Sequence, residues 1–234
     1  MDLKNKIENR SANIGVIGLG YVGLPLSMEF VRAGFKVTGI DVNTKKVGMI
    51  NAGNNYIQDV SDNELASAVS DGNLTATTDF AVTKILDSVS ICVPTPLKKQ
   101  KNPDISFIVS AMNEVEKYIH PEMIIILEST TYPTTTRDVV LPLLAESGLA
   151  VGSDYFLAYS PEREDPGNPD YSAAGIPKVV GGIDEPSGQV AAALYEQTIV
   201  QVVPVGSPEV AEACKILENT YRAVNICLLY TSPS

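Results

Sequence analysis

Three glycines near the N-terminus have the spacing that binds a dinucleotide. Gly18, Gly20 and Gly23 form a GxGxxG pattern, with Tyr21 and Val22 between the last two. The first glycine permits a tight turn, the second lets a pyrophosphate approach the backbone, and the third lets a helix pack closely on a strand. The phosphates would meet free N–H groups at the N-terminus of that helix. The pattern is weak alone and needs a strand before it and a helix after it.

Asp41 is the second element of this predicted site. It lies 18 residues after Gly23, at the end of the next predicted strand. A carboxylate there accepts hydrogen bonds from the adenosine ribose hydroxyls and repels a 2′-phosphate, which favours NAD over NADP. Lys46 is close enough in sequence to soften that repulsion. The alternative is a glycine turn and a surface acid without a ligand.

The elements that must position these residues alternate along the chain. Short apolar runs predict strands at 13–18, 35–41, 74–78, 88–94, 123–130, 155–160, 177–182 and 198–205. Helical spacing predicts helices at 21–33, 44–53, 62–70, 104–119, 135–146 and 186–197. This alternation predicts an α/β fold of the Rossmann type, doubly wound, with a mainly parallel sheet covered on both faces.

A further helix begins near residue 207. Ser207 suits the N-cap and Pro208 the first helical position. Apolar residues then recur at four-three spacing as one stripe, formed by Val210, Cys214, Leu217, Tyr221 and Val224. We therefore divide the chain into an N-terminal extension (1–12), an NAD-binding Rossmann domain (13–206) and the start of a long central helix (207–226).

Composition excludes several classes of protein. The net charge of −11 argues against a nucleic-acid surface. The longest apolar runs are far too short to span a bilayer. Three cysteines without regular spacing fit a reducing compartment, so we expect a cytoplasmic protein without a metal site.

Several ordered motifs resemble the UDP-glucose/GDP-mannose dehydrogenase family over about residues 12–226. These motifs are "GLGYVGLPLS" (18–27), "DVNTKKV" (41–47), "VPTP" (93–96), "EST" (128–130), "SPEREDPGN" (160–168) and "AEACKILENTYRAVNI" (211–226). They look most like the branch that oxidises UDP-N-acetylglucosamine or UDP-N-acetylmannosamine. The resemblance implies NAD-dependent oxidation of the sugar C6 alcohol to a carboxylate, through a cysteine thiohemiacetal and thioester, in two hydride transfers. It also implies polysaccharide precursor synthesis and a homodimer formed through the central helix.

The resemblance assigns roles to matching residues. It places Thr95 beside the cofactor and Thr130 near the nicotinamide and the attacking water, although turn capping would explain both threonines. Glu162 matches the glutamate that activates water, and Arg163 would help to bind the substrate. Without the resemblance, Glu162 is one more acid in an acidic loop.

Lys215 and Asn219 match a pair that holds the oxyanion at C6. They are four residues apart, so they share one face of a helix. A cation with an amide donor suits a developing negative charge. Periodicity alone would equally fit a solvated polar face.

The cysteine nucleophile that the resemblance requires has no match here. Cys92 and Cys214 are expected in the core, and Cys227 lacks the glycine-rich context of that nucleophile. The family pattern also departs after Ile226, and we interpret 227–234 as a non-native tail of a truncated, inactive fragment that lacks the UDP-binding domain.

Three functions compete for this sequence. The first is a UDP-N-acetylhexosamine 6-dehydrogenase, with UDP-glucose as the alternative substrate. The second is a non-catalytic NAD-binding module. The third is a 3-hydroxyacid-type dehydrogenase, which also places a Lys and an Asn on a helix after its nucleotide domain. The motifs at 128–130 and 160–168 favour the first over the third.

Overall fold

A twisted sheet forms the centre of the molecule. The computed structural model describes residues 2–98, 103–162 and 176–231 of the chain. In these residues eight strands pair in the order β3-β2-β1-β4-β5-β6-β7-β8. The strands are β1 (Asn13–Ile17), β2 (Lys36–Ile40), β3 (Leu74–Thr77), β4 (Ser88–Ile91), β5 (Ile124–Leu127), β6 (Phe156–Tyr159), β7 (Lys178–Gly182) and β8 (Val202–Val205). The predicted strands are confirmed, with shorter bounds.

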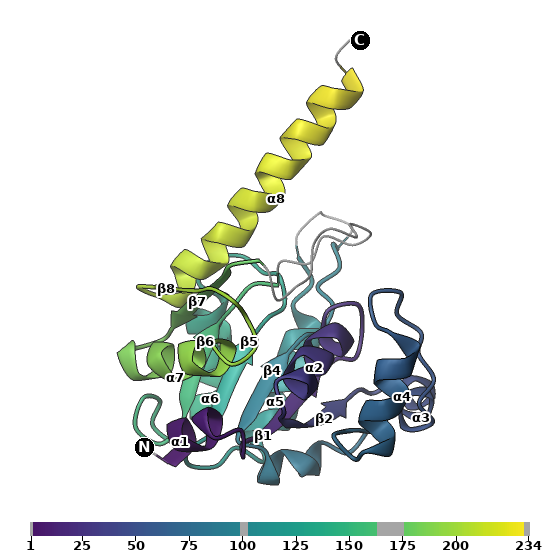
Figure 1. Ribbon diagram of the computed structural model, residues 1–234. Helices are drawn as coiled ribbons and strands as arrows, with labels where there is room; N and C mark the ends of the chain where they lie inside the picture. Colours follow the sequence, from purple (N-terminus) through teal and green to yellow (C-terminus); the bar gives the residue numbers. More distant parts are fainter. Residues whose placement is uncertain (1, 99–102, 163–175, 232–234) are drawn as a thin grey trace.

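Helices cover both faces of this sheet (Figure 1). One core packs under α1 (Asp2–Glu8), α2 (Gly23–Arg32), α3 (Thr44–Asn51), α4 (Asp62–Ser70) and α7 (Glu185–Tyr195). The other core packs under η1 (Phe80–Ile85), α5 (Ser106–Glu116), η2 (Thr136–Val140), α6 (Leu141–Ala145) and the start of α8 (Pro208–Thr231). Every residue of β4, β5, β6 and β7 is buried, which explains the continuous apolar runs of β5 and β6. The predicted doubly wound α/β architecture is confirmed.

One strand breaks the parallel order. β7 pairs antiparallel with β6, whereas all the other neighbouring strands run parallel. An antiparallel neighbour needs no crossover helix, and the sequence from 161 to 176 has no helical period. As a consequence, Lys178 at the start of β7 lies at the edge of the sheet where β5 and β6 end.

Two helical segments escaped the sequence analysis. In the predicted extension, α1 places Leu3 and Ile7 in the core, and Lys6 pairs with Asp87 at 2.9 Å. The 3-10 helix η1 begins after Asp79, whose carboxylate accepts the N–H of Ala81. α1 has seven residues and η1 has six, so neither is long enough for an apolar period to repeat.

The last helix, α8, projects from the domain as a long rod (Figure 1). Its apolar stripe faces outward, since Leu217, Tyr221 and Val224 are all more than half exposed. The face that packs on the sheet contains Ala211, Glu212 and Lys215, all buried. Cys214, expected in the core, is only partly buried. Of the helices in the described part of the chain, none combines the length and apolarity that a bilayer crossing requires.

Candidate functional site

A pocket of about 390 Å³ opens at the carboxyl ends of the central strands. It lies where the strand order reverses, between β1 and β4, which is where open α/β sheets bind ligands. It is lined by residues that follow β1, β2, β4, β5 and β6: Gly18, Gly20, Tyr21, Val22, Asp41, Lys46, Cys92, Val93, Pro94, Thr95, Glu128, Ser129, Thr130 and Glu162. All the predicted cofactor residues except Gly23 therefore meet in one cavity.

The glycine loop forms one wall of this pocket. Gly18 has a φ of +93°, and a Cβ there would lie 2.7 Å from the carbonyl oxygen of Cys92. A Cβ on Gly23 would collide with the carbonyl oxygen of Gly18. Nothing lies within 4 Å of the corresponding point at Gly20. Two glycines are thus required by the fold, and the third leaves open space at the pocket wall.

The start of α2 supplies hydrogen-bond donors to the same space. Its N-cap, Val22, provides no side-chain acceptor. Leu24 donates its N–H to the Gly20 carbonyl at 3.1 Å and Pro25 has no N–H, so the N–H groups of Val22 and Gly23 remain to face a ligand. Together with the helix dipole, they favour an anion such as a pyrophosphate. The open position at Gly20 and the uncapped α2 fit a dinucleotide.

Asp41 lines the pocket at the end of β2. Its carboxylate accepts the N–H of Leu19 at 2.9 Å and the N–H of Asn43 at 2.8 Å. Lys46 Nζ lies 3.5 Å from the same carboxylate. Tyr56 donates its hydroxyl to the Leu19 carbonyl at 2.6 Å, and burial raises the pKa of this tyrosine. Asp41 therefore fixes the glycine loop as well as facing the cavity.

Thr95 and Thr130 bridge two strand ends. The Thr95 hydroxyl donates to the carbonyl of Thr130 at 2.7 Å, and Ser129 donates to the carbonyl of Val93 at 2.7 Å. This Thr95 bond joins residues 35 positions apart, so it ties two loops together and is not a local turn cap. The same bond holds both threonines at the pocket wall.

A buried charged network forms the floor. Lys178 Nζ lies 2.7 Å from Glu128 Oε2, and the Tyr195 hydroxyl donates to Glu128 Oε1. The Lys178 ammonium also lies 4.7 Å from the centre of the Tyr195 ring. Glu162 approaches this cluster, with its carboxylate 3.7 Å from Lys178 Nζ. The network therefore connects the buried interior with the residue that the resemblance marks as catalytic.

Burial and charge act in opposite directions in this network. Burial raises the pKa of Glu128 against the opposing effect of Lys178. Burial alone would lower the pKa of Lys178, but the carboxylates of Glu128 and Glu162 outweigh it and raise that pKa. Lys178 is therefore a stable buried cation. Burial likewise raises the pKa of Tyr195, so its hydroxyl stays protonated and donates.

Lys215 reaches the pocket indirectly. Its ammonium donates to the backbone carbonyl of Glu162, and the residue is only 9% exposed. The solvated-face interpretation is therefore wrong for Lys215. Asn219, one turn later, is exposed and does not line the pocket. Arg163 lies outside the described residues.

The sequence analysis missed the charged floor. Glu128 and Lys178 were each treated only as part of a strand or motif. A signal was present, because an acid ends the run "MIIILE" (123–128) and a lysine opens the buried strand "KVVGG" (178–182). A charge at the end of a fully apolar strand calls for a buried partner. Which charges pair could not be read without the fold.

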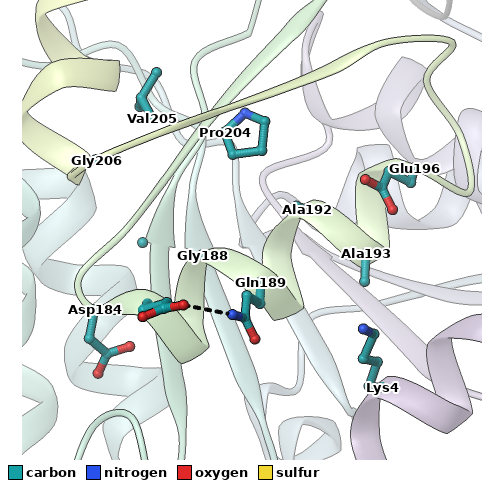
Figure 2. A pocket seen from close by; sticks show the side chains of 12 residues that line it. Lys4, Asp184, Gly188, Gln189, Ala192, Ala193, Glu196, Pro204, Val205 and Gly206 are labelled. Carbon is teal, nitrogen blue, oxygen red and sulfur yellow. Dashed lines mark hydrogen bonds between the residues drawn. The ribbon is translucent and has the colours of Figure 1, made fainter.

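A second hollow, of about 460 Å³, lies between α7 and β8 (Figure 2). Its polar lining includes Lys4 and the acids Asp184, Glu185 and Glu196. Asp184 is occupied in capping α7, where its carboxylate accepts the N–H of Ser187. No predicted site residue lines this hollow. In the described part of the chain, His, Cys, Asp and Glu form no group of three that would hold a metal ion.

Comparison with known proteins gives a consistent result. Residues 12–199 match the model of the UDP-glucose/GDP-mannose dehydrogenase family, NAD binding domain. The chain is 37% identical to Protein CapL of Staphylococcus aureus over 93% of its own length and 50% of the relative. It is 34% identical to the UDP-N-acetyl-D-glucosamine 6-dehydrogenase of Pseudomonas aeruginosa, over 94% and 52%.

A solved structure supports the same assignment. The UDP-D-ManNAc dehydrogenase of Pyrococcus horikoshii superposes with a TM-score of 0.86 at 32% identity, covering 92% of this chain and 52% of that one. The chain spans about half the length of the curated relatives it matches.

Proposed function

The chain belongs to the UDP-glucose/GDP-mannose dehydrogenase family, and from that premise we propose that it forms the NAD-binding half of a UDP-N-acetylhexosamine 6-dehydrogenase. Several similar proteins are named as UDP-N-acetyl-D-glucosamine or UDP-N-acetyl-D-mannosamine dehydrogenases. The observation that carries the proposal is the single pocket that joins the glycine loop, Asp41 and Glu162. One wall suits a dinucleotide, and the other holds groups suited to acid–base chemistry.

Each part of this pocket has a role toward the cofactor. The uncapped start of α2 and the open space at Gly20 would hold the pyrophosphate. Asp41 would accept the ribose hydroxyls, and its charge would disfavour a 2′-phosphate. Thr95 and Thr130 would border the nicotinamide end. Bound NAD supplies the hydride acceptor for oxidation of an alcohol carbon.

Glu162, Lys215 and Asn219 would act on the substrate. The Lys215 ammonium is held at the Glu162 backbone, so the two residues are neighbours at the pocket rim. A fixed cation there would stabilise the oxyanion that develops at C6, and Asn219 would add an amide donor from the next turn. Glu162 would then serve as the base that activates water.

The oxidation of an aldehyde to a carboxylate needs a thiolate in the scheme that the family resemblance implies. Cys92 is buried beneath the glycine loop, Cys214 is partly buried, and Cys227 is exposed far along α8. None combines pocket access with an exposed thiol, as a reactive cysteine requires. We assign this role to a cysteine of the longer protein, and we expect this chain alone to bind NAD without turnover.

The exposed apolar stripe of α8 is a candidate surface for binding a second copy of the chain. Val210, Leu217, Tyr221 and Val224 leave apolar surface uncovered on one side of the helix. Contiguous exposed apolar surface marks association sites. We infer that two copies pair through α8, as the family resemblance implies. A cytoplasmic location, where NAD is available and thiols stay reduced, fits the three free cysteines.

One assay tests the proposed function. NADH formation is followed with UDP-N-acetylglucosamine, UDP-N-acetylmannosamine and UDP-glucose, for this chain and for a version extended to the relatives' length. We expect the extended protein to form two NADH per UDP-N-acetylhexosamine and this chain to form none. An extended protein that binds NAD but oxidises no UDP-sugar would favour the non-catalytic alternative.

A further inference from the structure

The start of α8 docks on the domain through charged side chains. Most of its apolar stripe faces outward, and the apolar residues that it buries, Pro208 and Ala211, are small. Instead Glu209, Glu212 and Lys215, spaced three residues apart, each bind the domain: the two acids bind residues 134–137, and the lysine binds the segment after β6. Glu209 pairs with Arg137 at 2.5 Å, and Lys215 binds the carbonyl of Glu162. The middle residue, Glu212, is the only one of the three that is completely buried.

The Glu212 carboxylate is bound at both oxygens. One oxygen accepts the N–H of Thr134 at 2.6 Å. The other accepts the N–H of Thr136 at 2.9 Å and its hydroxyl at 2.7 Å. Hydrogen bonds to a charged acceptor are worth roughly twice as much as neutral ones. Three of them inside the protein make Glu212 the strongest anchor between α8 and the domain.

These bonds fix a strained segment. Thr134 has a φ of +78°, a left-handed conformation that a β-branched residue rarely adopts. Such strain persists only where surrounding contacts hold it. The segment continues directly from Thr130, which lines the pocket and is bound by Thr95. Glu212 therefore joins the central helix to the wall of the nucleotide pocket.

Lys215 follows Glu212 by three residues, less than one turn. Any rotation of α8 that released Glu212 would also carry Lys215 away from the Glu162 carbonyl. We propose that Glu212 is a positioning residue, which holds α8 in the orientation that places the Lys215 ammonium beside Glu162 and the pocket. The consequence for catalysis rests on the proposed function, whereas the placement of Lys215 does not.

The surroundings of Glu212 agree with this role. Glu209 on α8, Arg137 on η2 and Tyr159 on β6 are the charged or titratable groups close to it. Burial raises the pKa of Glu212, and the hydrogen bonds from Thr136 and Thr134 oppose that rise. The carboxylate therefore depends on these donors, and removing its charge weakens all three bonds together.

Two buried lysines make the test internally controlled. Lys215 depends on α8 for its position, whereas Lys178 is held by Glu128 within the sheet. In the 234-residue chain labelled with ¹⁵N-lysine, hydrogen exchange of the two ammonium groups is measured by NMR. Each signal is assigned from its loss in Lys215→Arg or Lys178→Arg. Glu212→Gln is compared with Glu209→Gln, a matched change one turn earlier.

We expect Glu212→Gln to accelerate exchange at Lys215 by about tenfold or more, while Lys178 keeps its wild-type rate. Glu209→Gln should leave both within about threefold, because its ion pair is exposed. Equal acceleration of both lysines, or none at Lys215, would overturn the proposal. If Glu212→Gln fails to fold, Thr136→Val removes one of the three bonds and must still accelerate Lys215 selectively. The readout needs no turnover, so a failed sugar assay bears only on the proposed function.

Discussion

The ammonium of Lys178 lies 2.7 Å from the carboxylate of Glu128, although both side chains are almost completely buried. The two residues are 50 positions apart and come from β7 and the end of β5. They meet because β7 runs antiparallel to β6, which brings its first residue to the carboxyl edge of the sheet. The antiparallel strand β7 therefore supplies the buried cation that pairs with Glu128 at the pocket wall.

This pair predicts strong thermodynamic coupling. Lys178→Met removes the cation beside the buried Glu128 and should cost about 3–5 kcal/mol in the free energy of unfolding. Glu128→Leu should cost somewhat less, because Lys178 keeps the Glu162 carboxylate at 3.7 Å. The double variant should cost at least about 2 kcal/mol less than the sum of the two single costs. Urea unfolding of the four proteins measures this. Additive single costs would show that the two charges are not coupled.

Alanine substitutions at two glycines of the loop should differ in their effects on stability and on NAD binding. Gly23→Ala meets the carbonyl of Gly18 and should destabilise the fold by about 2 kcal/mol or more. Gly20→Ala enters open space and should change stability by less than about 0.5 kcal/mol. Gly20→Ala should nevertheless weaken NAD binding by tenfold or more, because the pyrophosphate approaches at this point. Thermal unfolding and calorimetric titration separate the two effects, and a Gly20→Ala protein with wild-type affinity would contradict them.

Asp41 predicts the choice between NAD and NADP. Asp41→Asn removes the charge and the ion pair with Lys46, and it leaves one acceptor oxygen for the N–H groups of Leu19 and Asn43. We expect NAD affinity to fall by about tenfold and the ratio of NADP to NAD affinity to rise. Asp59→Asn, at an exposed position, is the control and should change neither affinity. An unchanged ratio in Asp41→Asn would place the ribose elsewhere.

Glu209 predicts a pH dependence of stability. The hydrogen bond from Arg137 lowers the pKa of Glu209 to about 2. Because the folded pKa lies below the ordinary value of 4.5, the stabilisation is complete above pH 4.5 and disappears as the pH falls toward 2. A ¹³C-carboxyl titration should show the low pKa, and Arg137→Gln should move it back toward 4.5. Titration near 4.5 in the unchanged chain would contradict the ion pair.

Much of this architecture could be predicted from residue patterns. The apolar runs and glycine spacing gave the sheet, the position of the glycine loop and Asp41 at its edge. These features depend on local periodicity and on backbone demands at single positions, which a sequence displays directly. The confirmed family likeness and NAD-binding domain rest on the same residues.

The parts that could not be predicted depend on pairing across the chain. Nothing near Glu128 in sequence indicates Lys178, and nothing near Glu212 indicates Thr134 and Thr136. The outward direction of the α8 stripe also depends on which face meets the sheet. A charged face carrying Glu212 and Lys215 docks on the domain, contrary to the usual preference for apolar faces.

We expect the pocket between β1 and β4 to bind NAD. Titration of NAD into the ¹⁵N-labelled chain, followed by amide NMR, tests it most directly. We predict saturable shifts at residues 18–23, 93, 95, 129 and 130, with little change at the second hollow near Gln189. Saturable binding that shifts the amides around Gln189 instead, or no shift at residues 18–23 at saturating NAD, would contradict the account.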